Sequence, residues 1–260
     1  MKHRPRKRFG QNFLHDQRVI DRIIACIAPQ PSDLLVEIGP GQAALTWPLL
    51  KTGAELHLIE IDRDLVAQLQ QQFSGHDNIT IHGCDALKAD LQDITSGRPF
   101  RLIGNLPYNI STPLIFHVLQ WHEQIIDMHF MLQKEVVDRM AAAPGGGDYG
   151  RLSVMIQYHC RVEPLFRVGP GAFKPAPRVD SALVRLTPWP QPPFPVKDTG
   201  LLTTLVRQAF SQRRKTLRNA LKGLLSEQGI RATGTDPAAR PETIGVEQYV
   251  ALANQLATET

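Results

Sequence analysis

Near its start, the chain has a segment in which apolar side chains recur every three or four positions. This spacing predicts an amphipathic helix that begins after Asp16 and ends before Pro29 and Pro31. Asp16 can cap its amino end, because a carboxylate accepts hydrogen bonds from the free amides of a first helical turn. The apolar positions are Val19, Ile20, Ile23, Ile24 and Ile27.

Beyond this helix, the pattern changes to short apolar runs separated by segments that can form helices. Alternation of this kind is typical of a parallel sheet covered on both faces, so it predicts a doubly wound α/β fold. A flexible loop is predicted over residues 144–150, and a last strand over 181–186. The apolar runs are residues 34–38, 56–61, 79–81, 102–103 and 128–132.

A proline-rich segment divides the chain. Residues 188–195 contain five prolines in eight positions, which neither a helix nor a central strand can accommodate. We therefore predict a larger α/β domain over residues 1–187, a linker over 188–195 and a small helical domain over 196–260.

Composition excludes several classes of protein. Apolar residues make up 42% of the 260 positions, which is typical of a compact globular chain. No run approaches the roughly 18 apolar residues of a membrane helix, and no apolar signal core follows the basic start. Cys26, Cys84 and Cys160 lie far apart, and no histidine spacing matches a zinc site. We expect a cytoplasmic protein without a metal.

Positive charge gathers at the two ends of the chain, whose net formal charge is +4. One basic run covers residues 2–8, and residues 201–226 contain six basic side chains and no acidic one. Either run alone could be a solvated surface. Together they favour a polyanionic partner such as a nucleic acid, without specifying a base sequence.

Residues 36–41, Val-Glu-Ile-Gly-Pro-Gly, end the first predicted strand in a glycine turn that can approach a ligand closely. Glu60 follows Gly39 by 21 positions, at the end of the second strand, where a carboxylate can accept both hydroxyls of an adenosine ribose. The same pattern suits an NAD site or a merely tight turn. Glu37 could bind loop amides near the cofactor or only organise the turn.

Two further motifs follow the third and fourth strands. Asp85 offers a carboxylate to an adenine amine, although an aspartate here is also an ordinary helix cap. Residues 105–108 read Asn-Leu-Pro-Tyr. With the glycine turn, this series resembles the class I S-adenosylmethionine-dependent methyltransferases, and its last motif resembles that of enzymes that methylate exocyclic amines of bases.

Chemistry explains the residue types of this last motif. The N6 amine of adenine is a poor nucleophile until acceptors hold its hydrogens, and Asn105 Oδ1 and the Leu106 carbonyl can be those acceptors. Pro107 restricts Leu106 to an extended conformation, and Tyr108 offers a face on which the base can stack. A loop turn fixed by proline is the structural alternative. A target base would have to be flipped out or unpaired.

Nearly end to end, the chain resembles the rRNA adenine N6-dimethyltransferase family, and specifically its small-subunit branch. The segments that carry the resemblance are residues 7–14, 37–41, 104–111, 173–181 and 210–218. The resemblance implies transfer of methyl groups from S-adenosylmethionine, which leaves as S-adenosylhomocysteine, to two adjacent adenosines near the 3′ end of 16S rRNA. It implies an immature 30S subunit as partner. We expect a monomer.

The resemblance also assigns roles to single residues. Asn12 and Leu14 would hold the methionine end of the cofactor, although without the family they read as a loop before the first helix. Phe173 is the candidate for a second aromatic lid on the base, with a core side chain as the alternative. The other assigned cofactor contacts are Gly39 in the loop, Glu60 for the ribose, Asp85 for the adenine and Asn105 between cofactor and target. The assigned rRNA contacts are Arg213, Arg214 and Lys215.

Three competing functions differ in substrate or class. A related large-subunit rRNA methyltransferase would share the fold and the Asn105 pocket. A binding protein that acts as an assembly checkpoint would methylate only incidentally. An NAD-dependent oxidoreductase would need a hydride-transfer constellation, and the sequence has no obvious one.

Overall fold

The computed structural model of the protein describes residues 11–212 and 214–259. The predicted basic run at residues 2–8 and the predicted contact residue Arg213 lie outside this part. Contacts divide the chain into two compact units: Met1–Val137 with Glu163–Pro188, and Asp138–Val162 with Trp189–Thr260.

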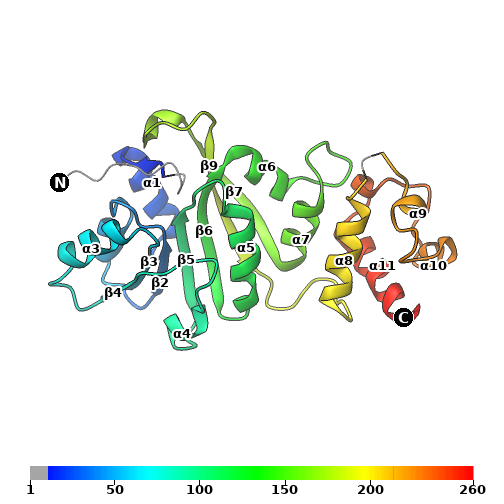
Figure 1. Cartoon of the computed structure of the whole chain (residues 1–260), viewed down its shortest axis with the longest axis horizontal. Helices are drawn as coiled ribbons and strands as arrows, with labels where there is room; N and C mark the ends of the chain where they lie inside the picture. Colours follow the sequence, from blue (N-terminus) through cyan, green and yellow to red (C-terminus); the bar gives the residue numbers. More distant parts are fainter. Residues whose placement is uncertain (1–10, 213, 260) are drawn as a thin grey trace. The chain divides into compact units, whose positions relative to one another are not determined.

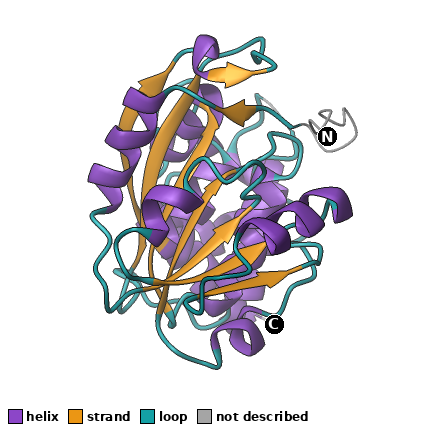
Figure 2. Ribbon diagram, turned by 90° about the vertical axis from the view of Figure 1, so that its left-hand side faces the viewer, coloured by secondary structure: helices purple, strands orange, loops and turns teal. Residues whose placement is uncertain are grey.

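The first unit is built on a seven-stranded sheet with the strand order β4-β3-β2-β5-β6-β9-β7 (Figures 1 and 2). The pairs β4–β3, β3–β2, β2–β5 and β5–β6 are parallel, and β6–β9 is antiparallel. The mostly parallel sheet confirms the predicted α/β architecture. The strands are β2 (Leu34–Ile38), β3 (Glu55–Ile59), β4 (Ile79–His82), β5 (Phe100–Asn105), β6 (Ile125–Gln133), β7 (Cys160–Val168) and β9 (Ser181–Pro188).

Helices follow the strands as the alternation predicts. Asp16 caps α1 by accepting a hydrogen bond from Val19 N, and Ala28 ends that helix in the left-handed region with φ of 46°. The predicted stripe faces inward through Ile20, Ile23 and Ile27. The helices of this unit are α1 (Gln17–Ile27), α2 (Thr46–Leu50), α3 (Arg63–Gln72), α4 (Leu91–Thr95) and α5 (Ser111–Val118), with 3₁₀ turns at Leu119–Trp121 and Pro170–Ala172.

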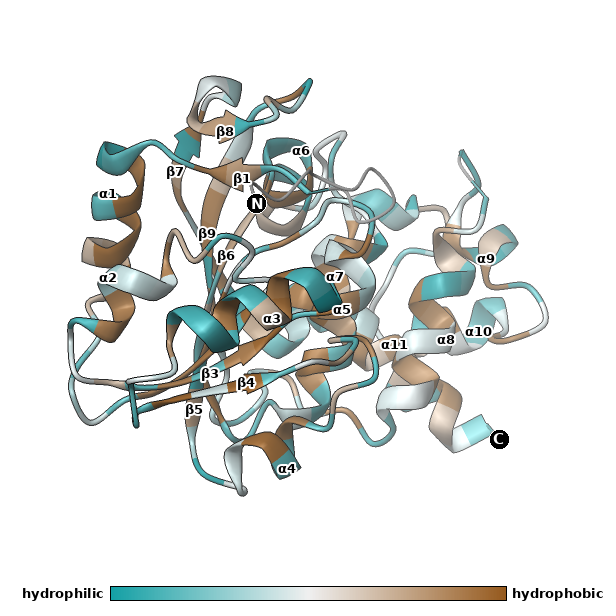
Figure 3. Cartoon of the chain, turned by 60° about the vertical axis from the view of Figure 1, so that its left-hand side comes forward, coloured by the Kyte–Doolittle hydropathy of each residue, from teal (hydrophilic) through white to brown (hydrophobic). Residues whose placement is uncertain are grey.

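The core of this unit lies around the central strands. All five side chains of β2 are buried, as expected for a parallel strand covered on both faces. Leu56 and Leu58 of β3 are also fully buried and continue the same apolar layer. The hydropathy colouring of Figure 3 shows brown, apolar stretches along these strands and polar positions along the outer faces of the helices.

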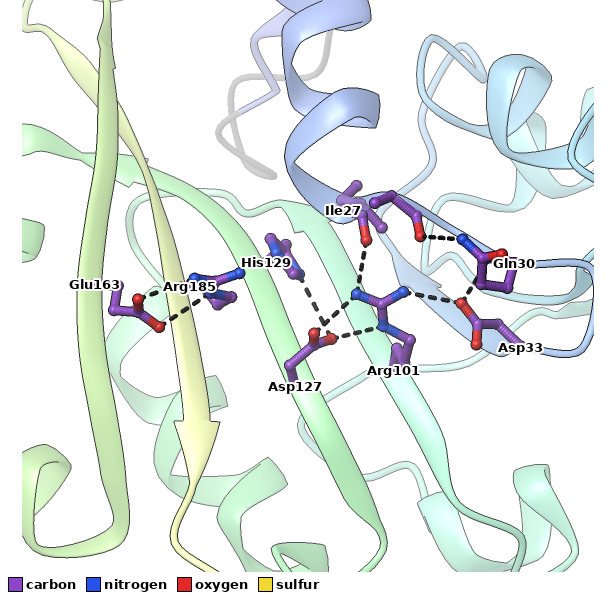
Figure 4. A network of polar contacts seen from close by, with 9 residues as sticks. Ile27, Gln30, Asp33, Arg101, Asp127, His129, Glu163 and Arg185 are labelled. Atoms are coloured by element: carbon purple, nitrogen blue, oxygen red, sulfur yellow. Dashed lines mark hydrogen bonds and ion pairs between the residues drawn. The ribbon is translucent and has the colours of Figure 1, made fainter.

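At the amino ends of β5 and β6, a partly buried polar network fastens α1 to the sheet (Figure 4). Arg101 makes two hydrogen bonds to Asp127, of 2.9 and 2.8 Å, and one of 2.8 Å to Asp33. It also donates to the Ile27 carbonyl at 2.7 Å, in the last turn of α1. Burial opposes ionisation of Asp127, but contacts with His129 and Arg101 outweigh it and lower the pKa of Asp127 to about 2. The network thus holds a charged cluster at the amino ends of these parallel strands, whereas the glycine turn follows the carboxyl end of β2.

The second unit is helical. Helices α7 and α11 both pack against α8, and α10 packs against α11. Its core includes an aromatic cluster of Tyr149, Phe210 and Tyr249. The helices are α7 (Arg151–His159), α8 (Thr199–Ala209), α9 (Leu217–Ala220), α10 (Glu227–Ala232) and α11 (Val246–Glu259), with a 3₁₀ turn at Pro241–Thr243, and α6 (Lys134–Ala141) runs across the boundary in the sequence.

The predicted break at residues 188–195 begins where the first unit ends, but the predicted division at 187 puts one segment in the wrong unit. Residues 138–162 cluster with the C-terminal helices. The reason is α7, which packs against α8 and α11 and whose apolar side chains Leu152, Val154 and Ile156 are buried. Among the described residues, no helix is both long and apolar enough to span a membrane.

Candidate functional site

The carboxyl ends of β2, β3 and β5 open onto a cavity of about 230 Å³. In the strand order, β2 lies between β3 and β5, so this is the point where the chain switches from one half of the sheet to the other. Open α/β sheets bind their ligands at such a point. The cavity is lined by residues 11–14, 37–42, 44–45, 59–61, 84–87 and 105–110. It brings together every predicted cofactor residue and the whole Asn-Leu-Pro-Tyr motif.

The glycine turn forms one wall. Gly39 and Gly41 have φ of 69° and 57°, a region that side chains with a Cβ adopt at a cost. At Gly41 a Cβ would also lie only 3.0 Å from two ring carbons of Phe13. The second glycine therefore serves a close approach between the loop and the N-terminal segment as well as the turn itself.

Glu60 follows β3, and its buried carboxylate points back to the glycine turn. Its Oε2 accepts from Gly41 N at 3.3 Å, and its Oε1 accepts from Ile61 N and Asp62 N at 2.9 Å each. Burial raises the pKa of Glu60, while the three amides oppose that rise. Because a carboxylate offers about four acceptor positions, Glu60 can still accept from a ligand hydroxyl in the cavity.

Glu37 lies behind the turn, 2% exposed, and accepts a 2.6 Å hydrogen bond from Thr46 Oγ1 at the start of α2. Burial raises the pKa of Glu37 to about 7, and the neighbouring charge of Glu60 adds to the rise. Of the two predicted roles, this contact favours organisation of the turn, since it holds the loop to the helix that follows.

Asp85 lines the cavity after β4, and its Oδ1 accepts from Leu87 N at 3.0 Å. Both predicted interpretations are therefore compatible: one oxygen caps the turn, and the carboxylate stands on the cavity wall where an adenine amine would be bound. Cys84 lies beside it, and burial raises the pKa of its thiol.

The Asn-Leu-Pro-Tyr motif also lines the cavity, and its asparagine has a defined orientation. Asn105 Nδ2 donates to the Asn12 carbonyl at 2.9 Å, which leaves Oδ1 to act as an acceptor. Leu106 N donates to the Met131 carbonyl at 3.1 Å, so the start of the motif stays joined to β6. Gly104 permits this geometry, because a Cβ there would lie 2.8 Å from the Ile38 carbonyl of β2.

A short N-terminal strand lines the cavity. The strand β1 (Phe13–Leu14) pairs antiparallel with β8 (Phe173–Lys174), and His15 N donates to the Ala172 carbonyl at 2.9 Å. This pairing holds residues 11–14 on the cavity wall, where Gln11 Nε2 lies 3.3 Å from Asp62 Oδ2. The sequence pattern gave no sign of either strand, and Gln11 and Phe13 were missed as lining residues.

Phe173 was predicted as an aromatic lid, and the structure places it elsewhere. Its side chain is 3% exposed and packs in the apolar core with Leu14 and Ala172, and it does not line the cavity. The pairing of β8 with β1 turns it inward. Its core alternative is therefore the one that the structure supports.

The predicted rRNA contacts belong to the helical unit. Arg214 and Lys215 are exposed after α8, and Arg214 has a φ of 73°, which is unusual for a residue with a side chain. Arg213 lies outside the described residues. Among the described residues, no three His, Cys, Asp or Glu side chains lie in positions to hold a metal ion.

The family model "Ribosomal RNA adenine dimethylase" matches residues 2–258 of the chain. A Pseudomonas fluorescens protein named Ribosomal RNA small subunit methyltransferase A is 60% identical over 258 residues, covering 99% of this chain and 96% of its own length. The protein of the same name from Pseudomonas aeruginosa is 59% identical, covering 98% of this chain and 96% of its own length.

Solved structures give the same picture of the fold. The 23S rRNA methyltransferase ErmE superposes with a TM-score of 0.73 at 27% identity, over 95% of this chain and all of its own. A dimethyladenosine transferase from Plasmodium falciparum superposes with a TM-score of 0.76 at 25% identity, over 92% of this chain and 95% of its own. The predicted fold, that of a class I S-adenosylmethionine-dependent methyltransferase, is confirmed.

Proposed function

Because the chain belongs to the ribosomal RNA adenine dimethylase family, we propose that it transfers methyl groups from S-adenosylmethionine to N6 of two adjacent adenosines in a hairpin loop near the 3′ end of 16S rRNA, dimethylating each. The observation that carries the proposal is the meeting of the glycine turn, two acidic strand ends and the oriented Asn105 in one cavity.

The cavity fits S-adenosylmethionine in two respects. Nothing lies within 4 Å of the position that a Cβ would take at Gly39, so a ligand could approach the backbone closely there, and carboxylates stand after β3 and β4, where the ribose and the adenine of the cofactor would need acceptors. Glu60 would hold the ribose hydroxyls and Asp85 the adenine amine. Asn12 and Leu14 would contact the methionine end, with Gly39 in the cofactor loop.

On the target side, Asn105 Oδ1 and the Leu106 carbonyl would accept the two hydrogens of the N6 amine. This draws the nitrogen toward a tetrahedral geometry and makes its lone pair available to the methyl carbon. Tyr108 would stack on the base, and Pro107 fixes the backbone that aims the Leu106 carbonyl. S-adenosylmethionine supplies an activated methyl group and leaves as S-adenosylhomocysteine, so the residues need to align and exclude water more than to act as a base. The N6 proton passes to solvent.

The names of the relatives support a small-subunit substrate, and the basic side chains Arg213, Arg214 and Lys215 would contact rRNA phosphates. The immature 30S subunit in the cytoplasm would then be the partner, with the enzyme acting as a monomer. The likeness to ErmE supports one rival, methylation of large-subunit rRNA.

Transfer of labelled methyl to unmethylated small subunits, large subunits and their naked RNAs, followed by nucleoside analysis, tests the proposal. We expect dimethyladenosine in small-subunit RNA. Label in large-subunit RNA would favour the rival, and no label would favour the checkpoint protein.

Asn105→Ala separates methylation from binding. We expect it to abolish methylation while subunit binding remains. Asn78→Ala is the matched control, because Asn78 Nδ2 also donates to a backbone carbonyl, that of Ala54 at 2.8 Å, outside the cavity. If Asn105→Ala still methylated, the assignment of the pocket would be wrong.

A further inference from the structure

Tyr108 is held at its backbone by the turn that contains it. Ile110 N donates to the Pro107 carbonyl at 3.1 Å, and Ser111 Oγ donates to the Tyr108 carbonyl at 3.2 Å. These bonds fix the backbone of Tyr108 but do not restrict the rotation of its side chain about χ1 and χ2. A ring that serves as a stacking surface must also have a fixed plane.

The far end of the ring has its own partner. The Tyr108 hydroxyl lies 2.7 Å from Ser181 Oγ, a side chain with no solvent exposure. Burial raises the pKa of Tyr108, so the phenol stays neutral and able to form this bond at neutral pH. The two ends of the side chain are therefore tied to different parts of the fold.

Ser181 is itself rigidly placed. It is the first residue of β9 and pairs with Gln133 at the end of β6. The preceding residue, Asp180, accepts a 2.9 Å hydrogen bond from Lys134 N through its carbonyl and binds Arg167 of β7 through its carboxylate at 2.6 Å. Contacts with β6 and β7 thus hold the start of β9, where Ser181 lies.

We infer that Ser181 is a positioning residue that sets the plane of the Tyr108 ring for stacking on the target base, a role that rests on the proposed function. Ser181 does not line the cavity and would touch neither cofactor nor base. Its loss should therefore weaken the use of RNA and leave cofactor binding unchanged. This arrangement also gives the antiparallel end of the sheet a part in substrate recognition.

The test compares Ser181→Ala, Tyr108→Phe and the double variant in methyl transfer to unmethylated small subunits. Each single change removes the same hydrogen bond, so each should lower kcat/KM for the subunit by about two- to tenfold, mainly through KM. The double variant should be no worse than the worse single variant. Dissociation constants for S-adenosylhomocysteine, measured by calorimetry, should stay within about twofold of wild type, the normal error of such a comparison.

Thr95→Val is the matched control, because Thr95 also has a fully buried hydroxyl, which bonds the Leu91 carbonyl at 2.7 Å away from the cavity. It should cost stability without changing kcat/KM. Full activity of Ser181→Ala, additive losses in the double variant, or a parallel loss of cofactor affinity would each overturn the inference.

A second readout does not depend on the substrate. In a double-mutant cycle on thermal unfolding, the Tm losses of Ser181→Ala and Tyr108→Phe should be less than additive. If the wild type methylated no rRNA, the proposed function would fail, and the cycle would still decide whether the two hydroxyls are coupled. Strictly additive losses would overturn the inference in either case.

Discussion

Two buried carboxylates face the same cavity, and their partners differ in kind. Glu60 accepts three backbone amides, whereas the hydrogen bond to Glu37 comes from the Thr46 hydroxyl alone in the described contacts. Backbone amides are fixed dipoles, and their hydrogen bonds offset part of the cost of removing the Glu60 carboxylate from water. Glu60 also has an acceptor position left for a ribose hydroxyl. Glu37 has far less compensation, which makes its ionisation costly.

This cost predicts how stability depends on pH. The pKa of Glu37 is about 7 in the folded chain against an ordinary 4.5. The protonated carboxyl therefore contributes its full stability below pH 4.5, and this contribution is lost as the pH rises through 7. The free energy of unfolding of Glu37→Gln relative to wild type should therefore increase by about 3 kcal/mol between pH 4 and pH 8. Denaturant unfolding at the two pH values measures this change.

Glu55→Gln provides a control of opposite sign. Hydrogen bonds from Arg98 lower the pKa of the exposed Glu55 to about 2, so its contribution is present at neutral pH and fades in acid. Its substitution should destabilise at pH 8 and have less effect at low pH. The same pH trend in both variants would contradict the assignment for Glu37.

Gly41 carries a second prediction at this scale. Gly41→Ala should weaken S-adenosylmethionine binding at least about tenfold, because the added Cβ meets the Phe13 ring in addition to the strained φ. Gly97→Ala has a similar φ of 70° and open space around the Cβ, so it should cost about 1 kcal/mol of stability and keep cofactor affinity. Calorimetric titration of both variants measures the difference, and equal affinities would exclude the close contact.

At the scale of elements, long apolar runs were predictable and short pairings were not. The run at residues 34–38 matches β2 in full, since four apolar residues in five positions favour a buried strand. By contrast, β1 and β8 have two residues each, and no periodicity exists over two positions. Their pairing arises from tertiary contact, and it moved Phe173 from the predicted lid into the core.

The strand β7 was missed for another reason. It lies at the edge of the sheet and contains Pro164, with charged residues on either side. Proline in a run argues against a central strand but is tolerated at an edge, where the missing donor faces no partner. Only the strand order shows that this segment is an edge strand, where a proline is tolerated.

The network around Arg101 joins elements that the sequence could not connect. Arg101→Met should lower the free energy of unfolding by up to about 3–5 kcal/mol, because it leaves the partly buried Asp127 and Asp33 without their cation. Arg98→Met, which breaks the exposed pair with Glu55, should cost less than about 1 kcal/mol. Urea unfolding of both variants tests this ranking, and similar losses would mean that burial of the network contributes nothing.

For the whole molecule, two units divide the chemistry. The cavity is built entirely from residues of the first unit, whereas the acid-free basic segment lies in the second. The sequence predicted a cofactor site in the one and an RNA contact in the other, because motifs and charge runs are local signals. It placed the division of units wrongly at residues 138–162, because the choice between sheet and helices depends on packing partners far along the chain.

This separation predicts that a substitution can weaken rRNA binding and leave cofactor binding unchanged. Arg213→Ala with Arg214→Ala should weaken binding to small subunits and reduce the slope of log affinity against log salt by about 0.7–0.9 for each phosphate contact removed. The control is Arg231→Ala with Arg240→Ala, which removes the same charge from arginines near Glu227 and Glu242 in the same unit and should change the slope less. Filter binding over a salt series measures both. Since Arg214 and Lys215 do not line the cavity, titration with S-adenosylhomocysteine should give unchanged affinity, and a parallel loss would indicate misfolding in place of a lost RNA contact.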